Sequence, residues 1–430
     1  MRKLVHFLRA WLAYWRYSRP ARKLVVIGIT GTKGKSSTCR FVASALEAGG
    51  HKVGLLSTVE FQIGDKRWLN DRKMTMLGRG EIQKMLKDMV RAGCDYAVIE
   101  TSSEGILQYR HYGLCYDVAV FTNLGTEHSE RHGGFEKLKE DKGKMFAALN
   151  FCHKKINGQK IKKVIVANVD DSHSEYYLNF PTDEKWGYGV EVKNNNGVEE
   201  HKTLSACSIS LKENGSEYFV ANQKYILNLP GQFNIYNSLA ATAVAFSQGI
   251  TPDQVTTGLE KVTLIPGRME MIEEGQNFKV IVDYAHEPMS LTELFTTLRQ
   301  MVGGHKIIAL VGSDGGGRDV GKREKMGEIA GKLADTVIIT DVNCFDEDPV
   351  QIAEMLAKGA RKAGKKDDLD LLIEVDRRKA IALGLSKAKP GDVVVITAKG
   401  TEPIIAIAGG ERIPWDDRVV AREELKKFLK

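Results

Sequence analysis

The sequence predicts an α/β protein in which mostly parallel sheets are covered by helices. Short apolar runs that read as buried strands alternate with longer helix-like stretches through much of the chain. Alternation of this kind is typical of parallel strands joined by crossover helices. The 430 residues suit about two or three domains, and a hydrophobic fraction of 43% can supply their cores. We therefore expect a central domain with a mostly parallel sheet and a Rossmann-like C-terminal α/β domain.

The expected strands follow one another along the chain. They are the ranges 24–27, 96–100, 118–122, 164–168, 280–284, 306–311, 336–340 and 393–397. Residues 191–229 read as short strands and turns, and helices are expected over 38–48 and 234–248.

A domain boundary is expected at Pro266 and Gly267, because these residues end the helical segment before them. The predicted organisation is an N-terminal amphipathic helix over 1–23, a central domain over 24–265 and a C-terminal domain over 266–430.

Residues 1–23 combine apolar and basic side chains at helical spacing. The apolar positions are Leu4, Phe7, Leu8, Trp11 and Trp15. The segment lacks the small-residue cleavage site of a signal peptide. The helix is expected either to pack on its own domain or to lie on a membrane surface, where Trp and basic residues suit the headgroup region. The chain has no apolar run long enough to span a bilayer.

Composition narrows the class of partner. The formal net charge of +7 is modest and spread out, which suits phosphorylated substrates. No nucleic-acid-binding motif accompanies it, so no nucleic-acid partner is expected. The six cysteines are isolated and form no C-x-x-C pair, so neither a zinc ribbon nor a disulfide framework is predicted. We expect a cytoplasmic monomer, with any contact to the inner membrane face made through residues 1–23.

The most informative stretch is GITGTKGKSS, from Gly28 to Ser37, which follows an apolar strand and precedes a helix. Strand, glycine-rich loop, Lys-Ser and helix form the layout of a phosphate cradle, in which backbone N–H groups approach phosphate oxygens. Lys35 adds a positive charge and Ser36 offers a hydroxyl to Mg²⁺, while the helix N-terminus favours anions. The alternative is a plain strand-to-helix turn, because Ile29 stands where the strict pattern has its first glycine. The layout predicts a P-loop-type central ATPase domain.

Two further strands are followed by residues that bind metals well. Glu100 ends the strand 96–100, and His128 follows the strand 118–122. Ligands of parallel-sheet enzymes lie beyond the carboxyl ends of strands, where these two side chains could hold Mg²⁺. A solvated Glu and a structural His are the alternative interpretation.

The C-terminal half has three polar clusters at strand ends. They are Asp283–His286, Gly312–Asp319 and Lys399–Glu402. Equivalent ends of parallel strands share one sheet edge, so Asp, His, Arg and Lys side chains would gather there. That mixture suits an anionic or zwitterionic ligand, although each cluster alone could be a turn.

The order of these motifs resembles the Mur ligase family and, among its members, the UDP-N-acetylmuramyl-tripeptide synthetases. The similarity runs from about Lys23 to the C-terminus. Gly31 to Ser37 resembles the family's Gly-Thr-Asn-Gly-Lys-Thr-Thr loop, and Glu100-Thr-Ser-Ser resembles Glu-Val-Ser-Ser. Further matching segments are Thr122–Gly133, Phe233–Asn237, Gly267–Glu270, Asp283–His286, Asp376–Arg378 and Asp416–Arg418.

The resemblance implies an ATP-dependent amide ligase of peptidoglycan precursor synthesis. In this family, ATP phosphorylates a substrate carboxylate, and an incoming amine attacks the acyl phosphate to give an amide, ADP and phosphate. The resemblance implies catalytic roles for Lys35, Glu100, His128 and Lys142. It also implies two Mg²⁺ ions held by Ser36, Glu100, His128 and a carbamylated Lys142. Spacing alone assigns Lys142 only to a solvated helix face, because lysine runs usually lie on one.

The resemblance further implies residues that bind ATP and the two substrates. The ATP set is Gly31, Thr32, Lys33, Gly34, Lys35, Ser36, Ser37, Asn234, Asn237, Arg268, His286 and Asp341. The set for a UDP-muramyl-peptide-like acceptor and an amino acid is Thr75, Thr101, Ser102, Ser103, Arg318, Asn343, Lys399 and Glu402.

The chain departs from the family pattern at several points. Lys33 replaces an Asn, and Phe345 stands where diaminopimelate-adding members have Arg. Without that Arg, a diaminopimelate carboxylate loses a bidentate partner, so lysine or another amino acid stays open. Family members usually carry an N-terminal UDP-binding domain, which we expect to be lacking because only residues 1–23 precede the first strand. Folylpolyglutamate and cyanophycin-type ligases and a non-catalytic nucleotide-binding scaffold remain alternatives.

Overall fold

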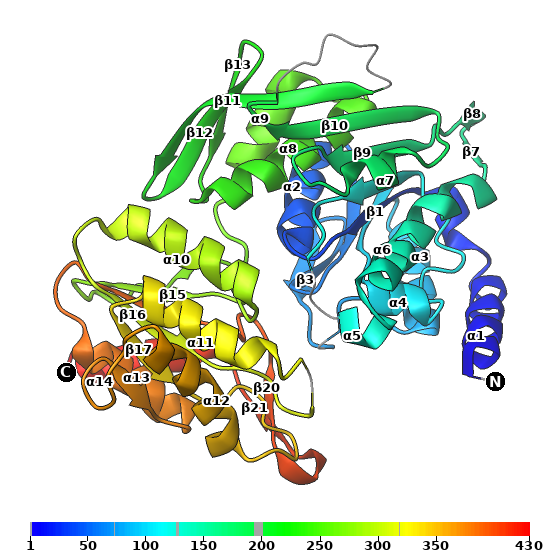
Figure 1. The fold of residues 1–430 in the computed structure, drawn as a ribbon. Helices are drawn as coiled ribbons and strands as arrows, with labels where there is room; N and C mark the ends of the chain where they lie inside the picture. The colour runs from blue at the N-terminus through cyan, green and yellow to red at the C-terminus, as the bar shows by residue number, and fades with distance from the viewer. Residues whose placement is uncertain (1, 73, 126–128, 193–200, 318) are drawn as a thin grey trace. The chain divides into compact units, whose positions relative to one another are not determined.

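Figure 1 shows the computed structural model of the chain, which describes residues 2–72, 74–125, 129–192, 201–317 and 319–430. The backbone divides into two compact units, Met1–Thr263 and Leu264–Lys430. Each unit has its own sheet and its own apolar core.

Unit 1 is built on an eleven-stranded sheet with the order β13-β12-β11-β10-β9-β6-β1-β5-β2-β3-β4. Every pairing from β11 to β2 is parallel, and antiparallel hairpins extend both edges. The strands are β1 (Val25–Thr30), β2 (Val53–Leu56), β3 (Glu60–Ile63), β4 (Lys66–Leu69), β5 (Tyr96–Glu100), β6 (Val118–Phe121), β9 (Val164–Asn168), β10 (Glu184–Val190), β11 (Lys202–Lys212), β12 (Gly215–Val220) and β13 (Gln223–Leu227).

The centre of this sheet is buried on both faces. β1 lies between β5 and β6, with Ile29 opposite Glu100 and Thr30 opposite Phe121. Every residue of β1 is buried, which explains why this strand reads as one apolar run. Because these strands are parallel, the loops that follow β1, β5 and β6 leave the sheet at the same edge.

Helices cover both faces of the sheet (Figure 1). On one face, α2 (Lys35–Ala48) packs against α8 (Gln232–Ser247) and α9 (Pro252–Glu260). On the other, apolar residues of four helices join one core with β1, β5, β6 and β9. These helices are α3 (Arg79–Arg91), α4 (Ser103–Leu107), α6 (Phe135–Ala147) and α7 (Ser174–Leu178). The shorter or peripheral elements are α1 (Arg2–Arg16), α5 (Ser129–His132), η1 (Pro20–Lys23), η2 (Ala148–Phe151), β7 (Lys155–Ile156) and β8 (Gln159–Lys160).

Unit 2 contains a six-stranded sheet with the order β14-β15-β19-β16-β17-β18, parallel except for β14. Its strands are β14 (Glu270–Met271), β15 (Lys279–Val282), β16 (Ile307–Val311), β17 (Thr336–Ile339), β18 (Leu371–Ile373) and β19 (Val393–Ile396). Its helices are α10 (Pro288–Val302), α11 (Lys322–Leu333), α12 (Pro349–Lys362), α13 (Arg377–Lys387) and α14 (Asp417–Phe428), and a small ribbon is formed by β20 (Ile404–Ala406) and β21 (Arg412–Pro414) around η3 (Ala408–Gly410). The predicted α/β class is confirmed.

One stretch differs from the expectation. Residues 191–229 were expected to form only short strands, but β11 is eleven residues long. Its pairing with β12 shifts register between Cys207 and Ser210. Such a bulge interrupts the period-two alternation of side chains, so the sequence pattern does not reveal one continuous strand.

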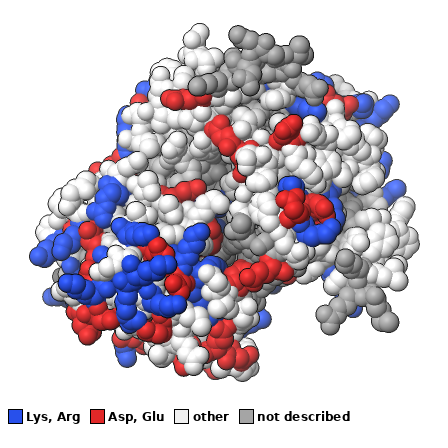
Figure 2. Space-filling view, viewed as in Figure 1, with Lys and Arg blue, Asp and Glu red and all other residues white. Residues whose placement is uncertain are grey.

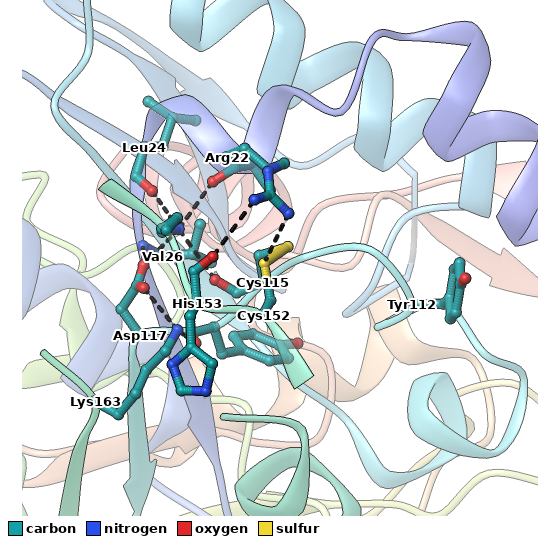
Figure 3. The surroundings of a disulfide bond; sticks show 12 residues. Arg22, Leu24, Val26, Tyr112, Cys115, Asp117, Cys152, His153 and Lys163 are labelled. Atoms are coloured by element: carbon teal, nitrogen blue, oxygen red, sulfur yellow. Dashed lines mark hydrogen bonds and ion pairs between the residues drawn. A yellow bond between two sulfur atoms is a disulfide. The ribbon is translucent and has the colours of Figure 1, made fainter. Parts of the chain in front are cut away.

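A buried ionic cluster lies at the amino end of β6 (Figure 3). Asp117 pairs with Lys154 at 2.6 Å and with Lys163 at 2.9 Å. Lys154 Nζ also donates to the carbonyl oxygens of Ala21 and Leu24, at 2.9 and 2.6 Å. Burial lowers the pKa of Lys154 to about 8. The backbone between α1 and β1 is therefore held by a buried amine.

Cys115 and Cys152 form a disulfide beside this cluster (Figure 3), with Cα atoms 5.3 Å apart. The expectation that all cysteines are isolated was wrong for this pair. The two residues are separated by 37 positions and come from the segments before β6 and after η2, so no local spacing pattern indicates the bond. Cys39, Cys94, Cys207 and Cys344 are thiols.

Candidate nucleotide and metal site

Two glycines shape the loop between β1 and α2. Gly34 precedes α2 with φ 74°, a left-handed conformation that favours glycine, and a Cβ there would lie 2.3 Å from Asn237 Oδ1. A Cβ on Gly31 would lie 1.9 Å from Thr122 Oγ1. Gly34 gives α2 no side-chain cap, so no cap competes with an anion for the backbone N–H groups of the first turn, which includes Ser37.

Lys35 and Ser36 begin α2 and contact different partners. Lys35 Nζ donates to the carbonyl oxygen of Thr32 at 2.8 Å. Ser36 Oγ donates to Glu100 Oε2 at 2.8 Å. Glu100 is the last residue of β5 and is 2% exposed. A hydroxyl and a carboxylate in contact provide the oxygen ligands that Mg²⁺ prefers.

Thr58 is a site residue that the sequence did not reveal. Its backbone N–H donates to Glu100 Oε2 at 2.7 Å, and its hydroxyl donates to Oε1 at 2.8 Å. The same hydroxyl lies 2.9 Å from Oγ1 of Thr75, a predicted acceptor-binding residue. Thr58 lies between β2 and β3, where no motif marks it. It fixes the orientation of the Glu100 carboxylate.

Lys142 reaches the loop from α6. Its Nζ donates to the carbonyl oxygen of Gly31 at 2.8 Å, and the residue is 4% exposed. The prediction from spacing that Lys142 lies on a solvated helix face is therefore wrong. Its neighbour Asp141 is buried as well and pairs with His132 Nδ1 at 2.7 Å. Lys142 therefore lies against the phosphate loop, whereas Asp141 contacts α5.

The end of β6 braces the loop from the other side. Thr122 Oγ1 donates to the Lys33 carbonyl at 2.7 Å, and Asn123 Oδ1 accepts the Lys33 N–H at 2.9 Å. The Asn123 carbonyl accepts the Thr32 N–H at 2.9 Å, and Thr32 Oγ1 accepts the Gly125 N–H at 2.8 Å. These bonds use the backbone of Lys33, so the change from Asn to Lys at this position leaves the brace intact.

Two asparagines on α8 lie at the start of α2. Asn237 Oδ1 accepts from Thr38 Oγ1 at 3.3 Å, across 199 positions of sequence. Asn237 Nδ2 donates to Asn234 Oδ1 at 3.3 Å, and Asn234 Nδ2 donates to the Pro230 carbonyl at 2.8 Å. Both asparagines are buried. The structure therefore brings these two predicted ATP-binding residues beside the loop.

Three predicted acceptor residues follow Glu100. Thr101 is fully buried, with its hydroxyl 2.9 Å from the Tyr116 hydroxyl, so it packs inside the unit. Ser102 caps α4 by accepting the Gly105 N–H at 3.2 Å, and Ser103 begins that helix. Ser102 is half-buried at the sheet edge.

In unit 2, three predicted substrate residues form one polar cluster. Lys399 Nζ is fully buried, 3.1 Å from Glu402 Oε2 and 3.3 Å from Asn343 Oδ1. Asn343 Nδ2 donates to Asp314 Oδ1 at 2.7 Å. Burial acts to raise the pKa of Asp314, but the bond from Asn343 and the charges around it outweigh burial and lower that pKa. In such a cluster, the lysine can contact the carboxylate of a zwitterion and a carboxylate side chain can contact its ammonium group.

The remaining predicted nucleotide residues of unit 2 also lie near strand ends. The Arg268 guanidinium lies 4.3 Å from the ring centroid of Tyr284, and His286 Nδ1 lies 2.8 Å from the Tyr284 carbonyl. Burial raises the pKa values of Asp283 and Asp341. Asp341 Oδ1 is buried with no hydrogen-bond partner among the described residues. An unpaired carboxylate oxygen fits a hydroxyl donor such as that of a ribose.

Two predicted residues, His128 and Arg318, lie outside the described residues. Within the described ranges, no group of three or more His, Cys, Asp or Glu side chains could hold a metal ion. Mg²⁺ usually takes only one or two carboxylates and completes its shell with water and phosphate oxygens. Ser36 and Glu100 therefore fit Mg²⁺ bound together with a nucleotide.

The fold and this site together define a nucleotide-binding α/β protein, in which a phosphate loop, a strand-end carboxylate and a buried lysine meet at one sheet edge. Residues 29–245 match the Mur ligase middle domain, and residues 267–400 match the Mur ligase glutamate ligase domain. The chain is 37% identical over 420 residues to a UDP-N-acetylmuramyl-tripeptide synthetase of Roseiflexus sp. (strain RS-1), covering 96% of this chain and 80% of that protein. The chain belongs to the Mur ligase family, whose members are ATP- and Mg²⁺-dependent ligases that form amide bonds.

Other known proteins agree with this assignment. A UDP-N-acetylmuramoyl-L-alanyl-D-glutamate–2,6-diaminopimelate ligase of Geobacillus kaustophilus (strain HTA426) is 35% identical over 415 residues, which cover 96% of this chain and 81% of that protein. A solved structure of a ligase with the same description is 29% identical, with TM-score 0.61, covering 95% of this chain and 79% of that one. A Mycobacterium tuberculosis folylpolyglutamate synthase, 17% identical with TM-score 0.67 over 91% of this chain and 92% of its own, shares the fold.

Proposed function

We propose that this chain adds an amino acid to a UDP-N-acetylmuramyl-peptide acceptor in peptidoglycan precursor synthesis. The observation that supports the acceptor is the 37% identity to a UDP-N-acetylmuramyl-tripeptide synthetase across 96% of the chain. An acceptor carboxylate oxygen attacks the γ-phosphorus of ATP and ADP leaves. The amine nitrogen then attacks the acyl carbon, and phosphate leaves as the amide forms and the amine loses a proton.

The loop residues Gly31 to Ser37 hold the ATP phosphates in this proposal. The first turn of α2 offers N–H groups to phosphate oxygens, and Lys35 supplies a charge that stabilises the transferring phosphoryl group. Ser36, Glu100 and His128 would hold Mg²⁺, which neutralises phosphate charge when bound. Asn234 and Asn237 complete the nucleotide set of unit 1. Arg268, His286 and Asp341 are the proposed nucleotide residues of unit 2.

We also propose that Lys142 is carbamylated and helps to hold a second Mg²⁺. Its amine is buried and lies 2.8 Å from the Gly31 carbonyl, at the base of the phosphate loop. The neutral amine nitrogen would bond to the carbon of CO₂ and release one proton. The resulting carboxylate would add a hard oxygen ligand at a position where the chain otherwise presents a cation.

The incoming amino acid is proposed to bind in unit 2 through Asn343, Lys399 and Glu402, with Arg318. Phe345 stands where diaminopimelate-adding members have Arg, so no guanidinium awaits a second carboxylate there. The proposal therefore does not specify which amino acid is added. Thr75, Ser102 and Ser103 are the proposed acceptor contacts. Thr101 is not among them, because it is fully buried with its hydroxyl on that of Tyr116.

The proposed organisation is a central ATP-binding domain over 24–265 and a C-terminal amino-acid-binding domain over 266–430. We propose a cytoplasmic monomer that contacts the membrane peripherally through residues 1–23.

The decisive experiment measures phosphate release from ATP with UDP-N-acetylmuramyl-dipeptide and a panel of amino acids that includes lysine and diaminopimelate. We expect release only when acceptor and one amine are both present. Lys35→Ala should lower turnover about 10²–10³-fold while leaving the unfolding midpoint unchanged. ATP binding without release for any amine would overturn the ligase proposal and favour a nucleotide-binding scaffold. Release with folate and glutamate instead would assign the chain to folylpolyglutamate ligases.

A further inference from the structure

The N-terminal helix α1 has one face fixed to unit 1. Ala10 and Ala13 are buried, and the Phe7 ring makes edge contacts with Tyr109 and Tyr112 at centroid distances of 5.8 and 5.0 Å. These contacts, together with the packing of α1 on α3, confirm that the helix packs on its own unit.

Two further contacts fix the rotation of α1 about its axis. The Tyr14 ring lies against Gly113, where a Cβ would be 2.4 Å from Tyr14 Cδ2, so the ring fills the space of a side chain. About two turns nearer the N-terminus, the His6 ring contacts the Arg79 guanidinium on α3. Because these residues lie on one side of the helix, the opposite side faces away from unit 1.

That opposite side carries a continuous apolar stripe. With about 3.6 residues per turn, positions 4, 8, 11, 12 and 15 fall on one side of a helix. The five residues are Leu4, Leu8, Trp11, Leu12 and Trp15, with exposed fractions of 62%, 47%, 42%, 59% and 50%. Contiguous exposed apolar surface of this kind marks a docking site rather than ordinary surface.

The charge around the apolar stripe has one sign. Residues 1–23 contain no Asp or Glu. Arg9 and Arg16 are exposed, and the Arg19 guanidinium lies 4.6 Å from the ring centroid of Trp15. The basic surface over α11 and α12 of unit 2 is different, because Figure 2 shows blue and red mixed there and pairs such as Lys358 with Glu324 neutralise it.

From these observations we propose that the apolar stripe docks the protein on an anionic lipid bilayer. The leucines and tryptophans would enter the headgroup region, and the arginines would contact lipid phosphates. Among the described residues, no helix is long and apolar enough to cross a bilayer, so the contact proposed is at the surface. This inference rests on the proposed function, which places the chain at the inner membrane face. The proposed ligase chemistry does not depend on membrane docking.

A second copy of the chain is a poorer occupant. A two-fold interface through the apolar stripe would place the same surface of both copies together. Arg9 and Arg16 would then face an equally basic surface, and like charges in an interface oppose association. An anionic bilayer meets both the apolar and the basic parts of the surface.

The test is vesicle flotation of the full chain with phosphatidylcholine alone and with phosphatidylcholine plus phosphatidylglycerol. We expect binding only to the anionic vesicles, weaker at high salt, with a blue shift of tryptophan emission. The double variant L8D/L12D should bind the anionic vesicles at least about tenfold more weakly than the parent chain, because two exposed apolar contacts become charges. The matched control Leu369→Asp changes a 68% exposed leucine of unit 2 and should bind as the parent chain does.

Two results would overturn the proposal: no binding of the parent chain to anionic vesicles, or equal binding of L8D/L12D. If the parent chain sediments as a dimer without vesicles and L8D/L12D sediments as a monomer, the apolar stripe would be assigned to a second copy of the chain. Phosphate release by L8D/L12D, measured in vesicle-free buffer, distinguishes a failure of membrane docking from a failure of the ligase proposal. Retained turnover with lost flotation supports membrane docking, whereas absent turnover in the parent chain contradicts the proposed function alone.

Discussion

Ser36 and Glu100 are joined by a 2.8 Å hydrogen bond that connects the start of α2 to the end of β5. The residues are separated by 64 positions and meet because β1 and β5 are parallel neighbours, with Ile29 opposite Glu100. A hydroxyl and a carboxylate suited to Mg²⁺ are thus brought together by strand register. Thr58 holds the carboxylate through both oxygens.

This contact predicts how Glu100 contributes. Glu100→Gln keeps the size of the side chain but removes its charge, so turnover should fall about 10²–10³-fold and half-maximal activity should require more Mg²⁺. Phosphate release measured across a Mg²⁺ titration checks this. Thr58→Ser keeps the hydroxyl and backbone N–H and is the matched control. An unchanged Mg²⁺ requirement in Glu100→Gln would contradict the metal role.

The contact between Gly34 and Asn237 predicts a coupled pair. Gly34→Ala places a methyl group 2.3 Å from Asn237 Oδ1 at φ 74°, which should cost about 1–3 kcal/mol of unfolding free energy. Asn237→Ala removes the clash, so the double variant should be more stable than the sum of the two single effects by at least about 0.5 kcal/mol. Urea unfolding of all four proteins measures this coupling. Additive effects would mean that strain in φ, and not the asparagine, accounts for the loss.

The proposed carbamylation of Lys142 predicts a dependence on CO₂. Lys142→Arg keeps a positive charge and a donor for the Gly31 carbonyl but cannot carry the carbamate, so turnover should fall about 10²-fold. The parent enzyme should lose activity in CO₂-free buffer and regain it with bicarbonate. A carbamate signal in ¹³C NMR after addition of ¹³CO₂, absent from Lys142→Arg, is a readout independent of activity. Full turnover by Lys142→Arg would rule out the carbamate.

His111 predicts acid sensitivity. Burial, with the charge of Lys144, lowers its pKa from 6.5 to about 4, and its Nδ1 is buried with no hydrogen-bond partner in the described structure. Below pH 6.5 the unfolded chain takes up a proton that the native state does not, so stability falls as the pH falls towards 4. The loss should reach about 3 kcal/mol near pH 4. Urea unfolding at several pH values should show a smaller loss for His111→Gln, and equal slopes would contradict the prediction.

The disulfide predicts a redox effect on stability. Closing a loop across the 37 positions between Cys115 and Cys152 should contribute about 4 kcal/mol of unfolding free energy. Reduction of the parent chain and Cys152→Ser should therefore lower the unfolding midpoint to a similar extent. Cys207→Ser, which changes an exposed thiol, is the control. A parent midpoint that does not respond to reductant would show that the bond does not stabilise the fold in solution.

The sequence predicts the strand-end positions of the site better than the residues that orient them. Glu100 and the loop can be found because a parallel sheet places its carboxyl ends at one edge. Thr58 cannot, since a threonine between two strands has no distinguishing pattern. Lys142 reads as solvated because its lysine-rich segment hides the buried face of α6. The resemblance, rather than the spacing, identifies it.

Contacts between residues far apart in the sequence are the second part of the structure that the sequence does not predict. Cys115 and Cys152 are brought together by the tertiary structure around β6 and η2, so neither spacing nor composition indicates the bond. The length of β11 is also not predicted, because the register shift at its bulge interrupts the alternation of side chains on which strand prediction depends.

Lys154 has a mechanical consequence for the N-terminal helix. Its amine holds the carbonyls of Ala21 and Leu24, immediately before β1, and is itself held by Asp117. Asp117 also accepts the N–H of Val26 within β1. The segment between α1 and β1 is thus tied through one buried amine to the strand that leads into the phosphate loop. We therefore expect a displacement of the segment that follows α1 to be passed to the start of β1, because Ala21, Leu24 and Val26 are held by the same buried ion pair.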